Sequence, residues 1–135
     1  METTVNVSAH AAALWVGLLL LQLLILSVLV VRQRTKYDVM LGDGGVPELA
    51  RASRAFGNAA EYVPAGMLAL TVLAMVQAPL LIVHITGGLL FVGRTVHAIG
   101  LSLSGGRSMG RTAGAVMTWL AFLFAGVTLL VYAVL

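Results

Sequence analysis

RASRAFGNAAEYVP, residues 51–64, places two arginines, an asparagine and a glutamate in a part of the chain that is otherwise apolar. At about 100° per residue, a helix gathers these side chains within roughly 80° of one another. They form one polar stripe, made of Arg51, Arg54, Asn58 and Glu61. Pro64 follows in the same run and leaves the carbonyl of Ala60 without its helical partner, which favours a kink. A polar stripe on a membrane helix indicates a functional site.

The composition is that of an integral membrane protein. Of the 135 residues, 60% are hydrophobic and only 10% are charged, whereas soluble domains carry about a quarter charged residues. The mean hydropathy is +1.02. At roughly 20 residues per span, the length suits four transmembrane helices. We therefore predict an all-α, four-helix membrane bundle in which residues 1–135 form a single membrane domain. The chain has no cysteine, so it supplies no disulfide, thiolate metal site or thiol nucleophile.

Four apolar runs mark the spans, and short polar breaks separate them. The second helix is expected to begin near Pro47, before its apolar part, and the uncharged break at residues 77–79 is so short that helices two and three must form a tight antiparallel hairpin. The Gly42–Gly45 loop lacks the lysine and preceding strand of a phosphate-binding loop. The predicted spans cover about residues 9–31, 55–77, 80–103 and 112–134.

The cations predict the orientation of the bundle. They cluster after the first span and after the third, while the opposite side offers Glu2 and the uncharged hairpin. The positive-inside rule then places the N-terminus outside and both basic loops in the cytoplasm. The net charge of +3 does not indicate nucleic-acid binding, because the basic residues flank apolar spans instead of lining a soluble face.

The tight hairpin allows depths to be compared. Glu61 lies 17 positions before Ala78 and Arg94 lies 16 after it, so at ~1.5 Å per residue both are about 25 Å from the turn. An unpaired arginine in a membrane is expensive, and we predict a structural ion pair between Glu61 and Arg94. Asn58 and His97 share the next level. For His97, a hydrogen bond to Asn58 and a contact to a ligand remain equal alternatives.

Cations outnumber acids at this level of the membrane. A cavity with surplus guanidinium attracts a carboxylate-bearing ligand through bidentate hydrogen bonds, and it would favour the thiolate form of a bound thiol. Snorkelling of the same side chains to anionic lipid headgroups is the alternative. The converging arginines are Arg51, Arg54, Arg94, Arg107 and Arg111.

The remaining polar residues of the spans are interpreted as structural. Gln22 is expected to make a hydrogen bond between helices, and His84 is expected to be a hydrogen-bonding group of the outer leaflet. No two histidines have the spacing of zinc ligands near an acid, so no metal site is predicted.

The motif R-x-x-R-x-x-x-N-x-x-E-Y-x-P, from Arg51 to Pro64, resembles the second-helix signature of MAPEG, the membrane-associated proteins in eicosanoid and glutathione metabolism. The segments GDGGxPEL (residues 42–49) and GRxxHAxG (residues 93–100) are similar to its small bacterial branch. The resemblance extends from Arg32 to Arg111 and includes the pattern of four spans.

The resemblance implies a homotrimer in the bacterial inner membrane that binds glutathione as a cosubstrate between protomers at the cytoplasmic side. The resemblance implies that Arg54, Asn58, Glu61 and Tyr62 hold it, with Arg51 beside them and Arg32 as a further carboxylate contact. The depth of Arg94 and His97 in the bundle adds these two to the expected binding residues. Arg111, or alternatively Arg107, would stabilise the thiolate. Eicosanoid-forming relatives carry tyrosines near the position of His97, and this chain has none there. The resemblance therefore favours a glutathione transferase or peroxidase acting on lipophilic electrophiles from the bilayer.

Two other functions compete with this interpretation, and the sequence leaves open whether the chain is an enzyme. The first alternative is a non-catalytic membrane scaffold or lipid-binding protein that keeps the polar stripe only for folding. The second is a small drug/proton antiporter, which needs a membrane-embedded acid in the first span. The first span here has no acid, and this alternative is disfavoured.

Overall fold

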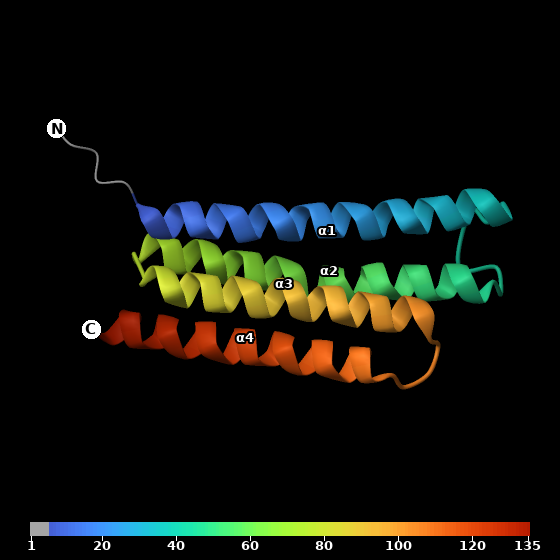
Figure 1. The fold of residues 1–135 in the computed structure, drawn as a ribbon. Coiled ribbons are helices and arrows are strands. Elements are labelled where there is room, and N and C mark those ends of the chain that lie inside the picture. The colour runs from blue at the N-terminus through green and yellow to red at the C-terminus, as the bar shows by residue number, and fades with distance from the viewer. Residues whose placement is uncertain (1–5) are drawn as a thin grey trace.

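The computed structural model describes residues 6–135, and in this part of the chain four long helices run antiparallel to their neighbours (Figure 1). All four are long and apolar enough to cross a membrane. The prediction of an all-α, four-helix membrane bundle is confirmed. The helices are α1 (Val7–Tyr37), α2 (Pro47–Met75), α3 (Leu80–Leu103) and α4 (Met109–Val134).

Local sequence signals set the helix ends. The Asn6 side chain accepts a hydrogen bond from the backbone N–H of Ala9 at 3.0 Å and caps α1. Pro47 occupies the first turn of α2, where its missing N–H is not needed. The Ser108 hydroxyl accepts from the N–H of Arg111 at 3.2 Å and caps α4. Pro64 lies inside α2, which continues through it to Met75.

The first helix extends beyond its apolar span, through Arg34 and Lys36 to Tyr37, and Asp38 caps it in a left-handed conformation. The Arg34 guanidinium then donates to the carbonyl oxygen of Gly42 at 2.9 Å and holds the following loop against the helix end. This loop turns through three glycines at positive φ, a conformation that glycine adopts without a steric penalty: Gly42, Gly44 and Gly45.

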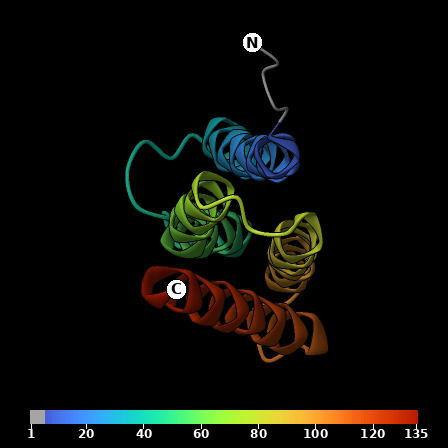
Figure 2. The same ribbon diagram turned by 90° about the vertical axis from the view of Figure 1, so that its left-hand side faces the viewer.

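Viewed along its axis, the bundle has α2 and α3 in the middle, with α1 on one side of this pair and α4 on the other (Figure 2). Leu19, Val63, Leu70 and Leu90 are fully buried between the helices. The predicted hairpin between α2 and α3 is present, closed by a hydrogen bond of 2.9 Å from the N–H of Ala78 to the carbonyl of Leu73.

Helices α3 and α4 approach each other closely where glycines face the neighbouring helix. A Cβ added at Gly93 would lie 3.0 Å from the carbonyl oxygen of Gly114, and a Cβ at Gly114 would lie 2.6 Å from the backbone nitrogen of His97. Neither helix could carry a larger side chain at these positions without moving away, so backbone atoms of α4 lie against α3 at the level of Arg94.

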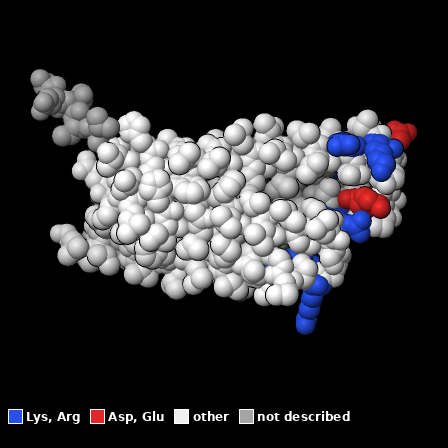
Figure 3. Space-filling view, in the orientation of Figure 1, with Lys and Arg blue, Asp and Glu red and all other residues white. Residues whose placement is uncertain are grey.

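The charged residues gather at one end of the bundle, which we call the basic end and which carries the loops at residues 38–46 and 104–108 (Figure 3). The opposite end, with the turn at residues 76–79, has no Lys, Arg, Asp or Glu among residues 6–135. There the Trp15 indole N–H donates to Nδ1 of His84 at 3.0 Å, which confirms a hydrogen-bonding role for His84. The compartment that the basic end faces stays a prediction.

Candidate functional site

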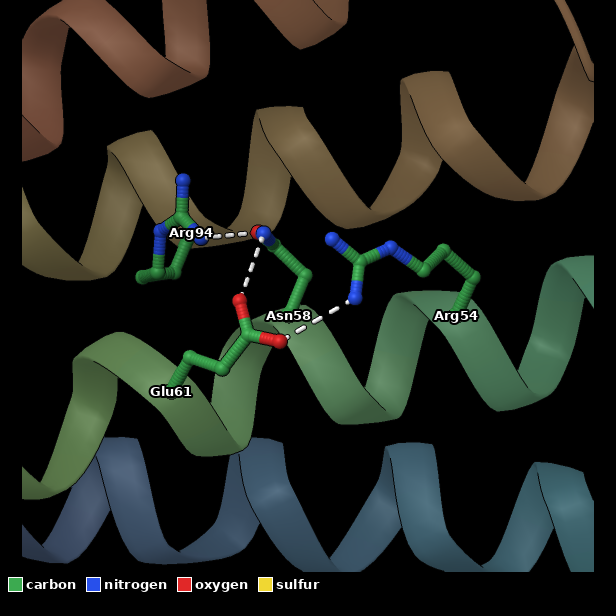
Figure 4. Close-up of polar contacts among 4 residues, drawn as sticks. All are labelled: Arg54, Asn58, Glu61 and Arg94. Atoms are coloured by element: carbon green, nitrogen blue, oxygen red, sulfur yellow. Dashed lines mark hydrogen bonds and ion pairs between the residues drawn. The ribbon is translucent and has the colours of Figure 1, made fainter.

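The polar stripe of α2 carries an ion pair on its outer side. Nη1 of Arg54 lies 3.1 Å from Oε1 of Glu61, and the two side chains are 59% and 54% exposed. Nδ2 of Asn58 donates to Oε2 of Glu61 at 3.5 Å. Figure 4 shows these three side chains along α2, with Asn58 between the ion pair and α3. The stripe therefore presents a cation and an anion side by side on a membrane-spanning helix.

Arg94 enters the bundle from α3 and is 2% exposed. Its Nη1 donates to Oδ1 of Asn58 at 2.6 Å, and its Nε donates to the hydroxyl of Thr118 at 2.8 Å. Its Nη2 lies 3.5 Å from the carbonyl oxygen of Gly114. The buried guanidinium thus joins α2, α3 and α4 through uncharged acceptors.

The predicted ion pair between Glu61 and Arg94 is wrong. Among residues 6–135, the ion pairs within 4.0 Å join Arg54 to Glu61 and Arg51 to Glu48. Glu61 lies on the exposed side of α2, while the amide of Asn58 faces α3 and bridges the two charges (Figure 4). Two acceptors on α4 bond to Nε and Nη2 of Arg94, so each of the three nitrogens of this guanidinium has an acceptor and none of these acceptors is a carboxylate.

Tyr62 completes the surroundings of Arg94. The centre of its ring lies 5.0 Å from Cζ of Arg94, within the range of a cation–π interaction. The same ring packs against Phe122 of α4, with ring centroids 6.0 Å apart. The aromatic face therefore stabilises the buried charge on a side where the guanidinium has no oxygen partner. Tyr62 contacts Arg94, which donates a hydrogen bond to Asn58. Asn58 in turn donates to Glu61, the partner of Arg54 in the ion pair.

His97, one turn after Arg94, is 9% exposed. The side chain of Asn58 bonds to Arg94 and Glu61 and not to His97, so the structural alternative predicted for His97 is not realised. His97 instead lines a pocket of about 290 Å³ between α3 and α4 at the basic end. The other polar and aromatic residues of this pocket include Arg107, Ser108, Arg111, Thr112 and Trp119.

The other predicted site residues lie around the α2 stripe and the pocket of His97. Arg111 donates through Nη1 to the carbonyl of Gly106 at 2.6 Å, and Arg107 is exposed in the same pocket. Arg51 is partly exposed, with Nη2 3.8 Å from Oε1 of Glu48. Arg32 is exposed on α1 and makes no hydrogen bond or ion pair in the described part of the chain with the residues of the α2 stripe.

Residues of α4 were missed by the sequence analysis. Thr118 and Gly114 bind Arg94, and Trp119 lines the pocket of His97. Gly114 and Thr118 are four residues apart and share one face of a helix. A small residue and a hydroxyl at this spacing, inside an apolar span, are the signal that could have identified α4 as the partner of Arg94.

This arrangement places an exposed ion pair beside a buried positive charge. Arg54 and Glu61 balance each other, and the buried charge of Arg94 has only neutral acceptors. The set of three charged groups therefore keeps one net positive charge. The exposed pair offers a bidentate donor for a carboxylate and an acceptor for an amine.

Comparison with known proteins supports a membrane assignment for most of the chain. The model of the MAPEG family matches residues 12–131. Two similar relatives are the proteins named Inner membrane protein YecN in two strains of Escherichia coli, K12 and O6:H1 CFT073. Each is 39% identical over 112 residues, which cover 83% of this chain and 84% of the relative. With the family match over most of the four-helix bundle, these findings show that the chain belongs to the MAPEG family.

Proposed function

We propose that this protein is an inner-membrane homotrimer that binds glutathione and presents its thiol to lipophilic electrophiles or hydroperoxides from the bilayer. One observation carries the proposal: the ion pair of Arg54 and Glu61 is more than half exposed on a membrane-spanning helix. Charged side chains that face lipid are expensive, and they normally face a bundle interior or a polar cavity. A second copy that covers this face would create such a cavity.

The residues of the α2 stripe fit the chemistry of glutathione. Its glutamyl end bears a carboxylate beside an ammonium group, and Arg54 and Glu61 present the complementary charges 3.1 Å apart. Asn58 and the ring of Tyr62 both contact Arg94, beside this ion pair. Arg94 holds the Asn58 side chain in place from the α3 side, because its Nη1 donates to the amide oxygen. We assign Arg54, Glu61, Asn58 and Tyr62 to binding and Arg94 to positioning.

When bound, glutathione supplies a thiol that reacts as a thiolate. Arg111 is the residue that we assign to stabilising the negative sulfur. One of its five N–H donors bonds to Gly106, and four donors stay available for an anion. Arg107 and His97 line the same pocket. Fixed donors directed at a developing negative charge are an effective form of catalysis.

The location and orientation follow from two lines of support. The relatives that match this chain are named inner membrane proteins, and the cations gather at one end of the bundle (Figure 3). By the positive-inside rule that end faces the cytoplasm, where soluble thiols are available. The proposed ligand would then reach the crevice from the cytosol, and the acceptor would arrive from the lipid.

Calorimetry on the purified protein tests the binding step. Addition of glutathione should release heat with the wild-type chain, and Arg54→Ala should abolish this signal. Arg54→Ala should hardly change stability, because an exposed ion pair contributes about 0–1 kcal/mol. Ser27→Ala on α1 is a matched control, because Ser27 belongs neither to the α2 stripe nor to the pocket of His97 and Arg111. A wild-type trimer that gives neither heat nor a thermal shift with glutathione would contradict the proposal.

The non-catalytic scaffold or lipid-binding protein remains the second candidate, and one observation favours it. Arg54 and Glu61 satisfy each other, and Arg111 bonds to its own loop, so these groups have partners without a ligand. Arg111→Ala separates the two candidates. The proposed enzyme should lose thiol-dependent turnover while the variant still assembles and binds glutathione. A scaffold should have no turnover to lose.

A further inference from the structure

The hydroxyl of Thr118 has two partners inside the bundle. It accepts a hydrogen bond from Nε of Arg94 at 2.8 Å and donates one to the carbonyl oxygen of Gly114, also at 2.8 Å. A bond to a carbonyl four residues earlier is common for threonine in a helix, and within residues 6–135 Thr128 of α4 makes only this kind of bond, to Phe124. The contact with Arg94 therefore gives Thr118 a role that Thr128 lacks.

The guanidinium of Arg94 joins Thr118 to the polar stripe of α2. Its Nη1 donates to Oδ1 of Asn58 at 2.6 Å, while its Nε donates to Thr118 (Figure 4 shows the bond to Asn58). A guanidinium is planar and its N–H groups point in fixed directions, so the Asn58 amide and the Thr118 hydroxyl are held at a set separation. Asn58 belongs to the proposed glutathione-binding residues, and Thr118 lies on the helix that carries Arg111. This one group therefore lies between the two halves of the proposed site.

The face of α4 that carries Thr118 also carries Arg111. The two residues are separated by two turns of helix, or about 10 Å along the axis. At the level of Arg111, α4 has a second contact with α3, because a Cβ added at Gly100 would lie 2.8 Å from the backbone nitrogen of Arg111. The Ser108 hydroxyl, which caps α4, lies 3.4 Å from the carbonyl oxygen of Gly100. Arg111 is therefore close to one contact and two turns from the other.

Two contacts along its length fix how α4 lies on the bundle. Figure 2 shows α4 crossing the other helices obliquely. A helix held at one point can still tilt about that point, whereas a second contact two turns away prevents the tilt. Without the Thr118 hydroxyl, Nε of a guanidinium that is 2% exposed would lose its acceptor. An unpaired buried donor is costly, so Arg94 and α4 would shift until another acceptor is reached.

We propose that Thr118 and Arg94 are positioning residues that set the distance between Arg111 and the α2 stripe, so that a glutathione held by the stripe has its sulfur beside Arg111. The inference rests on the proposed function and adds to it the residues that align the two halves of the site. Neither Thr118 nor Arg94 needs to touch the sulfur. Their effect is geometric, and a small displacement of a group that stabilises charge is enough to slow a reaction.

The first experiment needs no ligand. The chain has no cysteine, so Ile99→Cys on α3 and Ala113→Cys on α4 can carry a pair of spin labels at exposed positions. Pulsed electron paramagnetic resonance, on labelled chains diluted with unlabelled protein, measures the distance between the labels within one chain. Thr118→Val keeps the shape of the side chain and removes the hydroxyl, and it should shift this distance by ~1–2 Å. Thr118→Ser should restore it, and Thr128→Val, the matched control, should not change it.

The second experiment measures the sulfur of bound glutathione. Ultraviolet absorbance reports the thiolate, and turnover is measured with chlorodinitrobenzene as the acceptor. Thr118→Val should lower both the thiolate signal and kcat about tenfold, while KM for glutathione changes less than about twofold, because Arg54 and Glu61 still hold the ligand. Gly100→Ala displaces the backbone of Arg111 directly and should cause the same loss. This second variant decides the question if Thr118→Val does not assemble.

The two experiments separate the inference from the proposed function. A wild-type protein that does not bind glutathione contradicts the proposed function, and the label distances then still decide whether Thr118 positions α4. Full thiolate signal in both Thr118→Val and Gly100→Ala would overturn the positioning role and leave the proposed function standing. An unchanged label distance in Thr118→Val would overturn it too, as would an equal loss of kcat in Thr128→Val, since removal of any hydroxyl from α4 would then suffice.

Discussion

At the residue scale, Arg94 explains how a guanidinium can be buried in this bundle without a carboxylate. Its three nitrogens reach an amide oxygen, a hydroxyl and a backbone carbonyl, and an aromatic face lies 5.0 Å from its Cζ. Each partner is neutral, so the charge is spread over dipoles instead of being cancelled. Within residues 6–135 the acid at this level is Glu61, and it lies on the outer face of α2.

Asn58→Ala should therefore destabilise the protein far more than Arg54→Ala. Removal of the Asn58 amide leaves one end of a buried guanidinium without its acceptor, and the loss of a hydrogen bond to a charged group is expected to lower the free energy of unfolding by about 1.5–3 kcal/mol. Thermal unfolding in detergent measures the difference. If the two variants unfolded alike, Asn58 would not be the principal partner of Arg94.

Gln22 tests the strength of a polar contact within the membrane. Its Nε2 donates to the Thr95 hydroxyl at 2.7 Å, while its Oε1 is enclosed without a hydrogen-bond partner among the described residues. In a double-mutant cycle, Gln22→Leu and Thr95→Val should show a coupling energy of about 0.6 kcal/mol. Gln22→Leu alone should have a small effect, because the substitution also removes the unpartnered oxygen. A coupling energy of zero would mean that the contact contributes nothing.

At the scale of the elements, α3 and α4 depend on close backbone approach. A Cβ at Gly114 would collide with the carbonyl oxygen of Gly93 and with Cβ of His97. Gly114→Ala should push α4 away from α3, weaken the contacts of Arg94 and lower the unfolding temperature. Gly126→Ala is the control on the same helix, since a Cβ there meets nothing within 4 Å. That control should be neutral or stabilising by up to ~1 kcal/mol.

The elements themselves could be predicted from the sequence, because apolar length and turn residues are local properties. The hairpin at residues 77–79 and the polar stripe of α2 both follow from such patterns. The partners of Arg94 could not be predicted, since comparison of depths along the bundle does not say which side chain faces which helix. Glu61 and Asn58 differ by less than a turn, yet one lies outside and the other faces α3. The sequence argument compared depths on α2 and α3 alone, so it did not consider α4 as a source of partners for Arg94.

At the scale of the whole molecule, the separation of charge predicts a single orientation. Gly105→Cys places a thiol in a basic loop, and Val76→Cys places one in the uncharged turn. In intact bacterial cells whose outer membrane has been permeabilised, a maleimide that cannot cross the inner membrane should label only position 76. Lysed cells provide the control in which both positions react. Labelling of position 105 in the intact cells would invert the proposed topology.

The buried guanidinium also has a consequence for biosynthesis. Arg94 is made before α4, yet Thr118 and Gly114 of α4 supply two of its three hydrogen-bond acceptors. Until α4 has inserted, this guanidinium lacks two of its three acceptors, which is a costly state within the bilayer. The final helix relieves it. A chain that stops before α4 would therefore keep a charged side chain within the membrane without these two acceptors, and it should be less stable than the full protein.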